Sequence, residues 1–121
     1  MPPAALIGLP HARLVFGVYT ALLTVASLLP ASELPTGVNF NDKAAHAACY
    51  LLFAILAAAL CASWRRYALV AAGLVLFGLL MEGAQGISGG REASLLDALA
   101  NAVGVAGGYG LVALHKYRRR A

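Results

Sequence analysis

The sequence predicts an all-α integral membrane protein, a bundle of four helices with both termini in the cytoplasm. Two observations predict this class. First, 61% of the 121 residues are hydrophobic and only 12% are charged, whereas soluble domains have about 25% charged residues. Second, the apolar residues gather in four long blocks without the alternation of β-strands. A small soluble helical domain is disfavoured, because this composition cannot cover a soluble surface. The length allows a single domain, residues 1–121.

Four apolar segments are expected to form helices, over about residues 13–30, 43–63, 67–86 and 95–115. A membrane span needs about 20 helical residues, with a usual range of about 17–25, and each segment reaches that range with its flanks. A cleaved signal peptide is an alternative for the first segment, because "VASLLPASE" offers small residues for cleavage. Three further spans follow, so a retained helix is favoured.

The basic residues predict the orientation of this bundle. Because successive connections alternate between the two sides of the membrane, seven of the nine basic residues fall on one side, which the positive-inside rule places in the cytoplasm. They are Arg13, Arg65, Arg66, Lys116, Arg118, Arg119 and Arg120. The other side has Lys43, Arg91 and all five acids, and therefore a charge of −3. The net charge of +4 therefore indicates no nucleic-acid partner, and we expect membrane lipids as partners.

The cytoplasmic helix ends carry residues typical of a membrane interface. Trp64, Tyr67 and Tyr117 lie where interfacial aromatic residues are expected. The tail "HKYRRR" suits anionic lipid head groups. We interpret it as a topology anchor, with a specific lipid site as the alternative.

Three ionisable residues open the second segment, "NDKAAHAACYLLFAIL". Asp42 and His46 are four residues apart and therefore share a helical face, with Lys43 beside it. Asp42 also suits the positive end of the helix dipole, so a helix start would explain it, but this does not explain His46. A carboxylate one turn from an imidazole can orient the ring and raise its basicity, and the same spacing would let both bind a metal.

Polar residues also occur at the end of the third segment and the start of the fourth. Glu82 and Gln85 share one face after a long apolar run and are interpreted as pocket residues; a glutamate at the interface that reaches water is the alternative. After two glycines, Arg91 presents a donor fork that matches carboxylate or phosphate. Asp97 lies one turn before Asn101, although a capping pattern that begins at Ser94 would also explain Asp97.

Gly104 and Gly108 continue the face of Asp97 and Asn101 deeper into the fourth segment. Their GxxxG spacing is the usual device for close packing of membrane helices. It predicts close helix contact on this face, with a homo-oligomer through Gly104 and Gly108 as one form of it.

Two stretches resemble the signatures of VanZ-like membrane proteins. "NDKAAHAACYLLFAIL" resembles the D-K-x-x-H opening of that family's second helix. "MEGAQGISGGREASLLDALANAVGVAGG" is similar to its second signature, an acid and glutamine, a loop arginine, then S-x-x-D-x-x-x-N-x-x-G. The match covers residues 41–108, and the first segment has no matching motif. The matched positions are Asp42, Lys43, His46, Glu82, Gln85, Arg91, Asp97, Asn101 and Gly104.

This resemblance implies a multi-pass protein of the bacterial inner membrane, linked to tolerance of the glycopeptide teicoplanin, but no settled reaction. We expect an accessory protein with a polar pocket on the outer face. This pocket is expected to bind an anionic lipid or a cell-envelope intermediate. The alternative is an enzyme that acts on a lipid-linked substrate. The candidate catalytic residues are His46 as general acid/base, Asp42, Asp97 and Glu82. The candidate binding residues are Lys43, Gln85, Arg91 and Asn101.

Two other chemistries are less favoured by the sequence. Transport with His46 and Glu82 as a proton relay is disfavoured, because the charges gather at one end of the spans and no inverted repeat is visible. Metal-assisted hydrolysis is conceivable, but one histidine with acids is a weak metal signature, and we predict no metal. No cofactor motif is visible.

Overall fold

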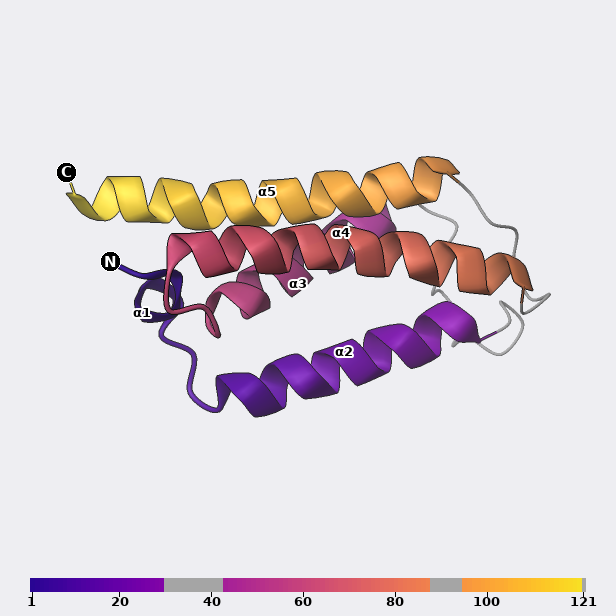
Figure 1. Cartoon of the computed structure of the whole chain (residues 1–121), viewed down its shortest axis with the longest axis horizontal. Coiled ribbons are helices and arrows are strands. Elements are labelled where there is room, and N and C mark those ends of the chain that lie inside the picture. Colours follow the sequence, from indigo (N-terminus) through magenta and orange to yellow (C-terminus); the bar gives the residue numbers. More distant parts are fainter. Residues whose placement is uncertain (30–42, 88–94, 121) are drawn as a thin grey trace.

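The computed structural model describes residues 1–29, 43–87 and 95–120 of the chain, and these residues form helices and short connections without any strand. The helices are α1 (Pro3–Ile7), α2 (Ala12–Leu28), α3 (Lys43–Ala58), α4 (Trp64–Ile87) and α5 (Leu95–Arg120). The predicted all-α class is confirmed. The four longer helices run alternately in opposite directions, so that α3 and α5 point the same way (Figure 1).

The structure differs most from the sequence prediction at two helix ends. α3 stops at Ala58 instead of about residue 63, because the next three backbone N–H groups bond three residues back, from Ala59 to Leu56, from Leu60 to Ala57 and from Cys61 to Ala58. These tight bonds end the helix in a turn that leads into α4. α5 continues to Arg120 rather than ending near residue 115.

The short helix α1 was not predicted. Its first residue is Pro3, which suits the first helical position because proline has no backbone N–H to satisfy. The backbone N–H of Ala4 donates to the carbonyl of Cys61 at 3.0 Å, and the indole of Trp64 donates to the carbonyl of Met1 at 3.1 Å. Contacts with the turn between α3 and α4 therefore stabilise α1, because an isolated helix of five residues would not be stable.

α3 packs most extensively against α5. A Cβ atom built on Gly104 would overlap the backbone carbonyl of Ala47, and one built on Gly108 would lie 2.5 Å from the carbonyl oxygen of Leu51. The two glycines therefore let parallel helices of the same chain approach closely. Because α3 covers this face of α5, the two glycines mediate packing between helices of the same chain. A homo-oligomer through Gly104 and Gly108 stays a prediction.

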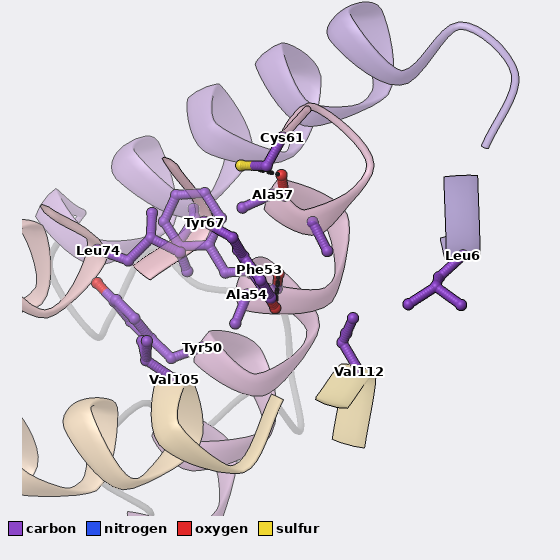
Figure 2. Packing of buried hydrophobic residues seen from close by; sticks show 12 residues of the cluster. Leu6, Tyr50, Phe53, Ala54, Ala57, Cys61, Tyr67, Leu74, Val105 and Val112 are labelled. Atoms are coloured by element: carbon purple, nitrogen blue, oxygen red, sulfur yellow. Dashed lines mark hydrogen bonds between the residues drawn. The ribbon is translucent and has the colours of Figure 1, made fainter. Parts of the chain in front are cut away.

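An aromatic core surrounds Phe53 and Tyr67, which are almost fully buried (Figure 2). The ring of Phe53 lies 5.2 Å from that of Phe16, and the ring of Tyr67 stacks on Tyr109 at 4.7 Å. The hydroxyl of Tyr67 donates to the carbonyl of Ala54 at 2.8 Å. The prediction of Tyr67 as an interfacial residue is wrong, because its side chain is buried against α3 and α5.

Tyr67→Phe is expected to lower the free energy of unfolding by about 1 kcal/mol, because the hydroxyl donates a fully buried hydrogen bond. Thermal unfolding of the protein in detergent, followed by circular dichroism, measures this change. Tyr117→Phe is the matched control, because Tyr117 is exposed and should leave the melting temperature unchanged. A Tyr67→Phe melting temperature equal to that of the control would contradict the prediction.

Two helices, α4 and α5, are long and apolar enough to cross a membrane. In the most apolar 18-residue stretch of each helix, only 22% of the residues of α4 and 33% of those of α5 are buried in the fold, whereas the core helix of a soluble protein would be mostly buried. Large apolar side chains also lie exposed along α2, α4 and α5, among them Leu14, Leu22, Leu69, Leu76, Leu80, Leu99 and Val103. Such an apolar exterior indicates a membrane protein.

The charged residues separate along the bundle. The first residues of α2 and α4 and the last residues of α5 lie at one end, together with six basic residues (Figure 1). These are Arg13, Arg65, Arg66, Lys116, Arg118 and Arg119. The opposite end is formed by the start of α3, the end of α4 and the start of α5. Its charged residues in the described part of the chain are Lys43, Glu82 and Asp97.

Candidate functional site

Three helices bring five polar side chains together at the end of the bundle opposite the basic residues. We call these residues the polar cluster. His46 comes from α3, Glu82 and Gln85 come from α4, and Asp97 and Asn101 come from α5. Their exposed fractions are 5%, 4%, 4%, 7% and 2%. All five were predicted as site residues from the sequence, and their chemical roles stay predictions.

Asn101 fixes the orientation of the imidazole of His46. The amide oxygen of Asn101 accepts a hydrogen bond of 2.9 Å from Nδ1 of His46, which requires that Nδ1 carries the proton. The other ring nitrogen, Nε2, then faces Asp97 Oδ2 at 3.9 Å. The role of Asn101 in ligand binding stays a prediction, and the structure shows the residue as a hydrogen-bond partner that orients the histidine.

Gly78 makes room for this pair. A Cβ atom at Gly78 would lie 3.1 Å from Asn101 and 3.1 Å from the ring of Tyr50. Glycine at this position of α4 lets the Asn101 side chain sit between the helices and reach His46 in α3. The glycine is therefore part of the support of the site, and its role was not evident from the sequence.

Asp97 lies between the histidine and a lysine. Its Oδ1 is 3.6 Å from Nζ of Lys43, and the lysine side chain is 55% exposed. Asp97 also lies in the first turn of α5, where the helix dipole stabilises a negative charge. The carboxylate therefore connects a buried imidazole to an ammonium group at the surface. The capping pattern with Ser94 lies outside the described residues.

Glu82 is buried and does not extend into bulk solvent, so the alternative of an interface glutamate is wrong. With Gln85 it lines a small cavity of about 10 Å³, together with Leu23, Ser27, His46, Cys49, Tyr50, Met81 and Asn101. A volume of this size holds about one water molecule. Four of the five residues of the polar cluster, all except Asp97, thus line a space for a single small species rather than for a whole lipid head group.

Two cavity residues with hydroxyl groups were missed in the sequence. Ser27 is a buried polar residue near the end of α2, and its position inside an apolar block gave no signal. Tyr50 lies one helical turn after His46 and is also buried. The spacing of four residues could have placed it on the same face as the histidine. Asp42 and Arg91, two predicted site residues, lie outside the described residues.

The cluster combines acid–base and ligand chemistry. His46, Glu82 and Asp97 each offer one donor atom, and these three atoms lie within 4.8 Å of one another. Burying a charge inside a membrane protein costs at least about 2.5–3.5 kcal/mol at the bilayer centre and less near a helix end, where this cluster lies. Three buried ionisable groups on three helices therefore indicate a function, since packing alone would favour apolar residues.

Comparisons with protein-family models, with curated proteins and with solved structures found no match to this chain. The resemblance to VanZ-like proteins therefore stays a prediction, and the function has to be argued from the site.

Proposed function

We propose that the chain is a VanZ-like protein of the bacterial inner membrane that crosses it four times, with both termini in the cytoplasm. The apolar exterior of α2, α4 and α5 supports the embedding. The six basic residues at one end of the described bundle support the orientation. α2 and α3 reach only about 26 and 24 Å at 1.5 Å per residue, so their flanking residues complete these two spans.

We further propose that the outer end of the bundle binds the anionic head group of a lipid or of a lipid-linked envelope intermediate, as an accessory function in glycopeptide tolerance. The observation that carries this proposal is the convergence of the polar cluster from three helices at the end away from the basic residues. In a membrane protein such a cluster faces a ligand or a partner by default.

Lys43 is the described residue best placed to contact a head group. Its side chain is half-exposed, and its ammonium nitrogen lies 3.6 Å from Oδ1 of Asp97. Because the cavity below holds about one water molecule, the head group binds above the cluster. A phosphate there is attracted by Lys43, and Asp97 holds the lysine at the mouth of the site.

A cross-linking experiment tests the location of this site. An anionic lipid with a photoreactive group in its head group is added to the purified protein in membranes, and the labelled peptides are identified by mass spectrometry. We expect adducts near the start of α3 and the end of α4, reduced about tenfold or more in Lys43→Gln, which corresponds to about 1.4 kcal/mol of binding. Arg65→Gln is the matched control, because Arg65 is exposed at the opposite end. Adducts confined to the basic end would contradict the proposal.

An enzyme is the second candidate, favoured by the fixed imidazole. Asn101 holds Nδ1 of His46 and leaves Nε2 beside Asp97, an arrangement that suits a general acid/base. Lipid analysis of cells with and without the protein distinguishes the candidates. A changed lipid or envelope intermediate that returns to the baseline in His46→Ala favours chemistry. An unchanged lipid profile, with cross-linking at the outer end, favours binding alone.

A further inference from the structure

We propose that His46, Glu82 and Asp97 form a binding site for a divalent transition-metal cation of the Zn²⁺ class. The three residues come from three different helices and are all more than nine-tenths buried. One donor atom from each lies within 4.8 Å of the other two. One imidazole nitrogen and two carboxylate oxygens form a ligand set that Zn²⁺ accepts in proteins.

The hydrogen bond to Asn101 prepares the imidazole for a metal. Because Nδ1 donates to Asn101 at 2.9 Å, the lone pair of a neutral ring is on Nε2, which faces Asp97 at 3.9 Å. A metal cation between Nε2 of the neutral ring and the Asp97 carboxylate would interact favourably with both. Metal-bound histidines almost always donate their second ring N–H in this way, which fixes the tautomer and raises the basicity of the ligand.

Distances and charge fit a cation of this size. Zinc bonds to nitrogen and carboxylate oxygen are about 2.0–2.2 Å, so the donors must move inward by roughly 1 Å. The two carboxylates and Lys43, whose ammonium lies 3.6 Å from Asp97, give the site one net negative charge when His46 is neutral. A buried negative site of this kind favours a cation.

The adjoining cavity has room for a fourth ligand of the metal, a water molecule. It is lined by His46, Glu82, Gln85 and Asn101 among others and has the volume of about one water molecule. Three protein ligands and one water are the arrangement of open zinc sites. One nitrogen among oxygen donors favours Zn²⁺ or Mn²⁺ over Mg²⁺, which prefers oxygen ligands and retains its waters.

This inference goes beyond the proposed function, because it requires no lipid. It proposes a metal where the sequence predicted none, and the metal titration below tests which of the two is correct. In the enzyme alternative it changes the role of His46 from a general base to a ligand.

Metal binding to the untagged full-length protein in detergent tests the inference. After treatment with a chelator, the protein is titrated with Zn²⁺, Mn²⁺ and Mg²⁺ by calorimetry, and bound metal is counted by elemental analysis. We expect about one Zn²⁺ per chain, bound more tightly than Mn²⁺ and far more tightly than Mg²⁺. Glu82→Gln and Asp97→Asn should each weaken binding at least about 100-fold. Asn101→Ala, which removes the hydrogen-bond partner of His46 but no metal ligand, should weaken it about 10–100-fold.

Controls separate this site from adventitious binding. His115→Gln removes an exposed histidine at the opposite end of the bundle and should leave the affinity unchanged. Circular dichroism and size-exclusion chromatography verify that each variant is folded, and Zn²⁺ should raise the melting temperature of the parent protein but not of Asp97→Asn. The proposal would be overturned if His115→Gln lost Zn²⁺ binding, or if the three cluster variants bound Zn²⁺ as tightly as the parent protein does. It would also be overturned if Zn²⁺ did not raise the melting temperature of the parent protein.

Discussion

Gly104→Ala is expected to lower the free energy of unfolding by about 3 kcal/mol or more, the upper end of the range for overpacked sites. The added methyl group would overlap the backbone carbonyl of Ala47, and a backbone atom cannot rotate away as a side chain can. α3 and α5 must therefore separate. Because His46 lies one residue before Ala47 and Asn101 lies on α5, the same movement should weaken their hydrogen bond.

Gly110→Ala is the matched control for this prediction. Gly110 lies on the same helix, and a Cβ atom there meets nothing within 4 Å. Alanine has a higher helix propensity than glycine by about 1 kcal/mol, so this variant should be neutral or slightly more stable. Thermal or denaturant unfolding in detergent measures both variants. Equal stability of Gly104→Ala and Gly110→Ala would show that α3 and α5 do not pack as closely as the structure has them.

Under the proposed function, His46→Ala is expected to abolish the tolerance of teicoplanin that the protein would confer on cells that express it. The imidazole is common to lipid binding, to acid–base chemistry and to the metal site, so its removal affects every form of the proposed site. The two remaining carboxylates can relieve their repulsion when one takes up a proton. We therefore expect the variant to insert and accumulate in the membrane.

Matched variants make this result interpretable. His115→Ala removes an exposed histidine at the opposite end and should retain the phenotype. Arg91→Ala, at a position outside the described residues, is expected to lose it as His46→Ala does. Immunoblots of the membrane fraction measure the amount of each variant. Full activity of both His46→Ala and Arg91→Ala at normal protein levels would refute the outer pocket in all its forms.

The sequence alone was sufficient to predict the helical class and most of the candidate site. Four apolar blocks of span length predicted the four longer helices, because hydrophobic length and the absence of charge are local properties of the chain. The spacing of Glu82 and Gln85, and of Asp97 and Asn101, predicted shared faces, since residues three or four apart on a helix are neighbours. These predictions depended only on positions within one helix.

Tertiary structure decided what lies between the helices. It paired Asn101 with His46, buried Glu82 and Tyr67, docked α1 on the turn after α3, and placed Gly104 against Ala47. Each of these features depends on the rotation and separation of two helices, which periodicity within one helix does not determine. The sequence determined which residues could share a pocket. Only packing decided that an imidazole and two carboxylates would be buried within reach of one another.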